Sequence, residues 1–149
     1  MDSNNASVGT LETLATTLID SINGYRDAAS HAEGTQFQEI FRRNADERSS
    51  VAEELRAEIT RLGGNAPDDG SFLGATHQRF LDLKAAVTGR DDKAIINEVE
   101  RGEDYIKEKF EAALAADLGP ETRTIIERAY QSVRKGHDQI RDLKHGMEA

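Results

Sequence analysis

Residues 37–62 decide the fold, and they read FQEIFRRNADERSSVAEELRAEITRL. Apolar side chains recur in this stretch at steps of three and four residues, which is the spacing of one face of an α-helix. The face consists of Phe37, Phe41, Asn44, Arg48, Val51, Ala52, Leu55, Ile59 and Leu62. An asparagine and an arginine therefore interrupt the apolar stripe near its middle. The Gly63–Gly64 pair that follows is typical of a left-handed helix C-terminus.

Three other stretches have the same period, and each carries a polar residue within its stripe. We expect the first helix of the chain to run from Thr10 to about Ala32. The third helix should begin at Asp91–Asp92, and the fourth helix at Gly119–Pro120. The polar residues on these three faces are Tyr25, Glu103 and His137. Asp20 lies off the stripe of the first helix. Thr35 and Gln38 have the spacing of a capping box at the start of the second helix.

The connections predict the topology. The first two helices are joined by a short segment, as are the last two, whereas about 25 residues separate these hairpins. A short helix near residues 75–87 should lie in this long connection. We therefore predict an all-α, ferritin-like four-helix bundle with a long crossover that carries one short extra helix. Residues 1–9 should form a disordered N-terminal tail, and residues 10–149 a single domain.

Composition excludes several classes of function. The formal net charge of −9 disfavours binding to nucleic acid or to an anionic membrane surface. The chain has no cysteine, so disulfides, thiolate metal sites and a thiol nucleophile are excluded. Neither a signal peptide nor an apolar run of ~20 residues is visible. We expect a cytoplasmic protein.

The polar residues inside the stripes have two interpretations. In the first, they form a structural polar core layer around an ion pair between Arg48 and Glu103; its members would be Tyr25, Asn44, Arg48, Glu103 and His137. In the second, inward acids and an imidazole bind iron or another divalent metal, at a di-iron or a mononuclear site. The candidate ligands are Glu47, Glu100, Glu103 and His137.

The metal interpretation meets two obstacles. A di-iron centre in such a bundle needs Glu-x-x-His on each of two helices, but Arg134 precedes His137 at that spacing. In addition, the guanidinium of Arg48 is permanently charged and would repel a dication. We therefore favour the structural interpretation and expect no cofactor and no catalytic residues.

Several short motifs resemble those of a bacterial family of short ferritin-like four-helix-bundle proteins of unknown function. They are LIDSINGYR at 18–26, DER at 46–48 with AEEL at 52–55, DLK at 82–84 with TG at 88–89, RGED at 101–104 and HDQIR at 137–141. The resemblance implies a cytoplasmic, stress-associated protein without a settled enzymatic activity. We accordingly expect a non-enzymatic protein that acts through binding or self-association. A metal-binding ferritin-like protein or oxidase is the alternative. The chain could form a homodimer, and the sequence identifies no protein partner.

Overall fold

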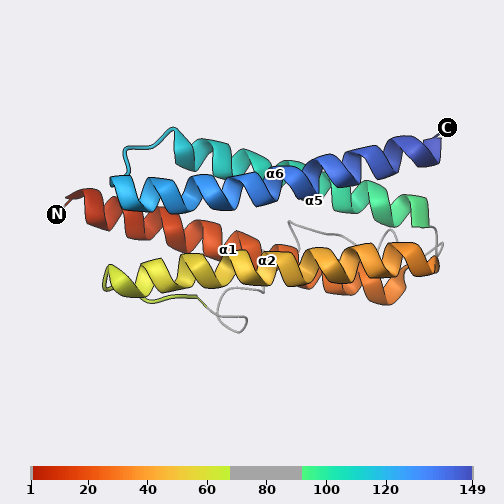
Figure 1. Ribbon diagram of the computed structural model, residues 1–149, viewed down its shortest axis with the longest axis horizontal. Helices are drawn as coiled ribbons and strands as arrows, with labels where there is room; N and C mark the ends of the chain where they lie inside the picture. Colours follow the sequence, from red (N-terminus) through yellow and green to blue (C-terminus); the bar gives the residue numbers. More distant parts are fainter. Residues whose placement is uncertain (1, 68–91, 149) are drawn as a thin grey trace.

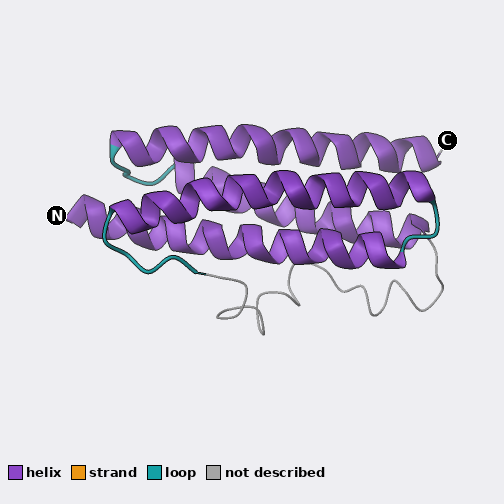
Figure 2. Ribbon diagram, turned by 60° about the horizontal axis from the view of Figure 1, so that its bottom comes forward, coloured by secondary structure: helices purple, strands orange, loops and turns teal. Residues whose placement is uncertain are grey.

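A computed structural model describes residues 2–67 and 92–148. Within these residues the chain forms four long helices, namely α1 (Asp2–His31), α2 (Thr35–Arg61), α5 (Asp92–Leu114) and α6 (Pro120–Glu148). They lie side by side as an elongated bundle (Figure 1 and Figure 2). The predicted all-α four-helix bundle is therefore confirmed. None of the described helices is long and apolar enough to cross a membrane.

The core runs along the bundle and is built from the apolar faces that the sequence predicts. The apolar members of the stripes are buried in α1 and α5 and mostly buried in α2 and α6; on α2, Phe37 and Leu62 are only partly covered. On α6, Met147 is likewise only partly buried. Each fully buried Leu, Ile or Phe side chain contributes about 1.5–3 kcal/mol. The stripes thus supply the main driving force for helix association.

The helix directions require a crossover between the two hairpins. α1 and α2 form one hairpin, and α5 begins at the end of the bundle where that hairpin turns (Figure 1). The turn between α1 and α2 contacts the start of α5 directly, because the backbone N–H of Gly34 donates to Asp92 Oδ2 at 2.9 Å. α2 and α5 therefore run parallel. The short helix predicted near residues 75–87 lies outside the described residues.

The start of α2 differs from the predicted capping box. Gly34, not Thr35, occupies the N-cap position, and no side chain of the helix caps it. Gln38 Nε2 instead donates to the carbonyl of Ala32 at 2.7 Å. The Asp92 carboxylate accepts hydrogen bonds from the backbone N–H groups of Glu33 and Gly34. These two donors precede the first turn of α2, so Asp92, a residue distant in the sequence, holds the turn between α1 and α2.

Two other helix ends bear on the predictions. Gly63 has a φ of 86°, so the left-handed C-terminus predicted for α2 is confirmed. α1 begins at Asp2, so residues 2–9 are helical where the sequence suggested a disordered tail and a start at Thr10. Tertiary contact provides the reason: Ser7 is buried, and its hydroxyl accepts a hydrogen bond from the backbone N–H of Gly119 at 3.4 Å.

Candidate functional site

Arg48 and Glu103 form a buried ion pair at the middle of the bundle. Arg48 comes from α2 and Glu103 from α5, and their residues are only 2% and 0% exposed. Arg48 Nη2 donates to Glu103 Oε2 at 2.6 Å, and Arg48 Nη1 donates to Glu103 Oε1 at 2.9 Å. This parallel two-bond geometry is the strongest arrangement between guanidinium and carboxylate. The parallel course of α2 and α5 brings the two side chains to the same height.

α1 completes the shell of this pair with two hydroxyl groups. The Tyr25 hydroxyl donates to Glu103 Oε1 at 2.7 Å, and Ser21 Oγ accepts from Arg48 Nη1 at 2.6 Å. The guanidinium carbon also lies 5.5 Å from the centre of the Tyr25 ring, which is a cation–π distance. Ser21 was not among the predicted site residues. A serine one turn before Tyr25 on a buried face was the signal available in the sequence.

Burial and charge hold these groups in one protonation state. Burial raises the pKa of Tyr25 well above its ordinary value, and the negative charge of Glu103 raises it further. The phenol therefore stays neutral and remains a donor. Burial alone would lower the pKa of Arg48, but attraction to Glu103 and its hydrogen bonds, together with the smaller effects of Tyr25 and Glu47, outweigh burial and the pKa is raised. The guanidinium of Arg48 therefore stays charged.

Gly136 explains how α6 fits against this network. A Cβ built on Gly136 would lie 2.7 Å from Arg48 Nη2 and 3.5 Å from Glu103 Oε2. Only a residue without a side chain lets the α6 backbone approach the guanidinium this closely. Arg48 Nη2 also makes a longer contact of 3.5 Å with the carbonyl of Val133. The network therefore touches all four helices. We refer to Ser21, Tyr25, Arg48 and Glu103 together as the polar lock.

The other two residues predicted for the polar layer lie beside the lock. His137 is 8% exposed, and its Nε2 lies 2.7 Å from Asp104 Oδ1. The buried amide nitrogen of Asn44 has no hydrogen-bond partner among the described residues. This amide is near enough to Tyr25 to influence the pKa of the phenol, as the weakest of several effects. Asp20, which was expected off the core stripe, is only 2% exposed.

The four candidate metal ligands are engaged separately. Glu47 Oε1 accepts from Ser132 at 2.8 Å, and Glu100 Oε1 accepts from Lys144 Nζ at 2.7 Å. Glu103 belongs to the polar lock, and His137 contacts Asp104. Within residues 2–67 and 92–148, no three His, Asp or Glu side chains gather as a set that could hold a metal ion. The metal interpretation therefore gains no support from this part of the chain.

Another buried carboxylate lies nearer the end of the bundle where α2 stops. Glu58 is 4% exposed and accepts hydrogen bonds from Arg61 at 2.6 and 2.7 Å and from Thr122 at 3.1 Å. These bonds, chiefly those from Arg61, lower the pKa of Glu58 although burial opposes the shift. Glu58 thereby joins α2 to the start of α6. It was not predicted, because the sequence places it at the edge of the stripe.

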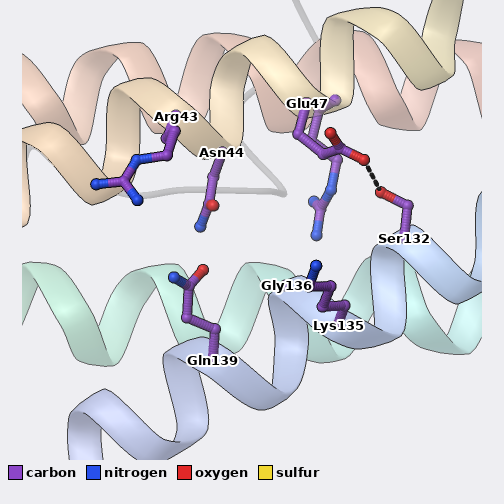
Figure 3. Close-up of a pocket in the computed structure, with 8 residues that line it drawn as sticks. Arg43, Asn44, Glu47, Ser132, Lys135, Gly136 and Gln139 are labelled. Carbon is purple, nitrogen blue, oxygen red and sulfur yellow. Dashed lines mark hydrogen bonds between the residues drawn. The ribbon is translucent and has the colours of Figure 1, made fainter.

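A polar groove lies on the outer side of the polar lock, between α2 and α6. Its volume is about 410 Å³, and it is lined by Arg43, Asn44, Glu47, Arg48, Ser132, Lys135, Gly136 and Gln139. Asn44 and Gln139 extend toward each other from the two helices, and Arg43 lies next to Asn44 (Figure 3). The hydrogen bond between Ser132 and Glu47 closes one side. No pattern in the sequence predicted this groove.

A comparison with known protein families identifies the family of this chain. A family described as "Domain of unknown function (DUF2383)" matches residues 6–116. The chain belongs to this family. The match to DUF2383 covers α1, α2 and α5, and therefore Tyr25, Arg48 and Glu103, but stops before Gly136 and His137 on α6. A search of curated proteins found no match.

Proposed function

We propose that this DUF2383 protein is a non-enzymatic, stress-associated bacterial protein that acts through binding or self-association. One observation carries the proposal: the centre of the bundle is filled by an ion pair whose hydrogen-bonding groups are largely satisfied. Glu103 accepts from Tyr25 and from both terminal nitrogens of Arg48. A carboxylate bound in this way is a poor general base and a poor metal ligand, because its acceptor sites are already in use.

The proposed role of the polar lock is to fix the register of the four helices. Removing two charges from water costs several kcal/mol, which their attraction largely offsets, so a buried pair need not add net stability. It does penalise every arrangement in which Arg48 and Glu103 fail to meet, because each would then be an unpaired buried charge. The bundle interior thus specifies the fold, and the surface is left to carry the function.

The finer family assignment is part of the proposal. The hairpin, crossover, hairpin order and the parallel course of α2 and α5 support a ferritin-like topology. The association with stress, the bacterial origin and the cytoplasmic location are supported by the sequence motifs alone. Measuring the amount of the protein in the source organism during growth, starvation and osmotic shock tests the stress association. A constant amount under all of these conditions would remove it.

Metal content tests the non-enzymatic proposal. The protein is produced in medium supplied with iron and manganese, and bound metal is measured by elemental analysis after gel filtration. We expect well below one metal ion per chain. Metal in a fixed ratio to the chain, lost in Glu100→Gln/His137→Ala but retained in the control His145→Ala, would overturn the proposal. His145 is a suitable control because it is an exposed histidine on the same helix.

Self-association is tested separately by light scattering across a concentration series. A mass that rises from one chain toward two with concentration supports a homodimer. The mass of a single chain at every concentration restricts the proposal to ligand binding. Catalytic consumption of dioxygen or peroxide by the metal-supplemented protein would instead favour the oxidase alternative.

A further inference from the structure

The groove between α2 and α6 has the size of a ligand site. Its volume of about 410 Å³ falls within the range of about 300–1,000 Å³ that small-molecule sites occupy. It lies halfway along the bundle, directly outside the polar lock, and Arg48 forms part of its wall. The two helices that line it come from different hairpins. The groove therefore exists only in the assembled bundle.

The charges around the groove favour an anion. Its lining contains Arg43, Arg48 and Lys135 but only one carboxylate, Glu47, in a chain whose net charge is −9. Arg48 is neutralised from behind by Glu103. Arg43 and Lys135 make no ion pair with any residue in the described ranges. Each is exposed at the mouth of the groove. A cationic groove on an acidic protein concentrates small anions, whereas the surrounding negative surface repels large polyanions.

The polar groups inside the groove favour a ligand with hydrogen-bonding groups besides its charge. The buried Asn44 Nδ2 donor has no acceptor within hydrogen-bond distance among the described residues. A bound acceptor atom would give it a partner. Gln139 faces Asn44 across the gap and offers both a donor and an acceptor (Figure 3). Glu47 is already held by Ser132 at the edge of the groove.

We propose that the groove between α2 and α6 binds a small organic anion. Its phosphate or carboxylate group contacts Arg43 and Lys135, and its neutral polar part accepts a hydrogen bond from Asn44 and contacts Gln139. This inference rests on the proposed binding function and gives it a site and a ligand class. Phosphate and carboxylate present the same chemistry to these side chains, since both offer paired anionic oxygens to guanidinium and ammonium donors.

The test is titration calorimetry of the full chain in a low-salt buffer free of phosphate. The probes are glucose 6-phosphate, citrate and, as the uncharged control, glucose. We expect at least one of the two anions to bind with a Kd at or below about 1 mM, and glucose not to bind. Binding of glucose 6-phosphate alone assigns the phosphate source, and binding of citrate alone assigns the carboxylate source. Affinity should fall as salt is added, because the groove is open to solvent.

Two double variants separate this site from a general charge effect. Arg43→Gln/Lys135→Gln removes the two cations at the groove, and Arg42→Gln/Arg134→Gln removes their exposed neighbours on the same two helices. The first pair should weaken binding of the anion by at least about tenfold, and the second by less than about twofold. Circular dichroism checks that both variants stay folded.

Either of two results overturns the inference. One is the absence of binding by both anions up to about 10 mM. The other is an equal loss of affinity in both double variants, which would show attraction without a defined site. Neither result bears on the metal content of the protein. A failure of the anion site is therefore distinguishable from a failure of the non-enzymatic proposal.

Discussion

Arg48 places a charge that cannot be removed by deprotonation between four helices. Its partner Glu103 is fully buried, so the two side chains depend on each other for compensation. The gain from such a pair is small relative to a well-packed apolar pair, whereas the loss when one member is removed is large. This asymmetry can be measured.

Replacing one member of the pair should cost far more than replacing both. Arg48→Met strands the Glu103 carboxylate in the core, and we expect a loss of about 3–5 kcal/mol in the free energy of unfolding. Arg48→Met/Glu103→Leu removes both charges and should recover part of that loss, although the Tyr25 and Ser21 hydroxyls then lose their partners. Urea unfolding followed by circular dichroism gives both values. A stable single variant, or a double variant weaker than the single, contradicts the account.

Gly136 should not tolerate even a methyl group. In Gly136→Ala the new Cβ would lie 2.7 Å from Arg48 Nη2, so the guanidinium or α6 must shift. Overpacking of this kind costs about 1–3 kcal/mol. Gly146→Ala on the same helix meets nothing within 4 Å and should be neutral or slightly stabilising, because alanine favours helix. Thermal unfolding of the two variants compares them. Equal melting temperatures would mean that α6 does not pack against the lock as described.

At the scale of single residues, the sequence shows which polar residues lie on an apolar helix face, but it does not show which neighbours they contact. Tyr25, Arg48 and Glu103 could be placed together because each falls on the centre of its stripe. His137 falls on the stripe too, yet its ring reaches Asp104 instead. Helical periodicity fixes the direction of the Cα–Cβ bond only approximately, and the rotamer then decides which neighbour is reached. Gly136 carries no polar signal, so its role was not predictable.

At the scale of the helices, Asp92 connects the two hairpins. It is the first residue of α5, and its carboxylate binds the turn between α1 and α2. Asp92→Ala removes the acceptor of the Glu33 and Gly34 N–H groups, and we expect a loss of about 1 kcal/mol, because these backbone donors lose their hydrogen-bond partner. Asp92→Asn keeps one oxygen acceptor and should lose less. The check is thermal unfolding monitored by helix content. Identical melting for Asp92→Ala and the native protein would show that these bonds do not stabilise the start of α2.

Glu58 should make the bundle sensitive to acid. Its pKa in the folded state is below the ordinary value of 4.5, chiefly because Arg61 donates to it. The unfolded chain therefore binds a proton more readily than the folded one below that pH. Glu58 contributes stability that is fully present above pH 4.5 and is lost as the pH falls through the lowered pKa.

The corresponding measurement compares urea unfolding at about pH 5.5 and about pH 3.5. The native protein should lose more of its free energy of unfolding over this interval than Glu58→Gln does. Glu39→Gln, at an exposed position on the same helix, controls for the loss of one negative charge. A native protein and a Glu58→Gln variant with the same loss would show that this carboxylate does not couple folding to pH.

The helices themselves were largely predictable, since each must bury a continuous apolar face and that requirement leaves its period in the sequence. Their starts were less so. The turn before α2 is held by Asp92, 58 residues beyond Gly34 in the chain, and no local pattern records such a partner. The first turns of α1 are similar, because Ser7 is buried and its hydroxyl accepts from the backbone N–H of Gly119, 112 residues away in the chain.

At the scale of the whole molecule, the polar lock should make the four helices unfold as one unit. Arg48, Glu103 and Tyr25 come from three helices, and α6 packs its backbone against them at Gly136. Native-state hydrogen exchange should therefore give similar free energies of opening for the central amides of all four helices. Arg48→Met should lower these values together. A loss of protection confined to α2 would show that the lock does not couple the hairpins.

The arrangement of the hairpins was accessible from connection lengths, whereas the groove was not. A short link forces antiparallel neighbours, so the parallel course of α2 and α5 follows from the long segment between them. A groove depends on how closely two helices of different hairpins approach. The groove here is lined by residues of both helices, such as Asn44 and Gln139, and no single stripe contains the information.

The division of the ion pair between hairpins has a consequence for assembly. Two copies of the α1–α2 hairpin that met through their apolar faces would bring one guanidinium against another, and two α5–α6 hairpins would bring two carboxylates together. Only the pairing of an α1–α2 hairpin with an α5–α6 hairpin brings opposite charges together, so that they neutralise each other. Fragments cut within residues 68–91 should therefore recognise each other as complementary halves, and an exchange of hairpins between two chains would satisfy the same rule.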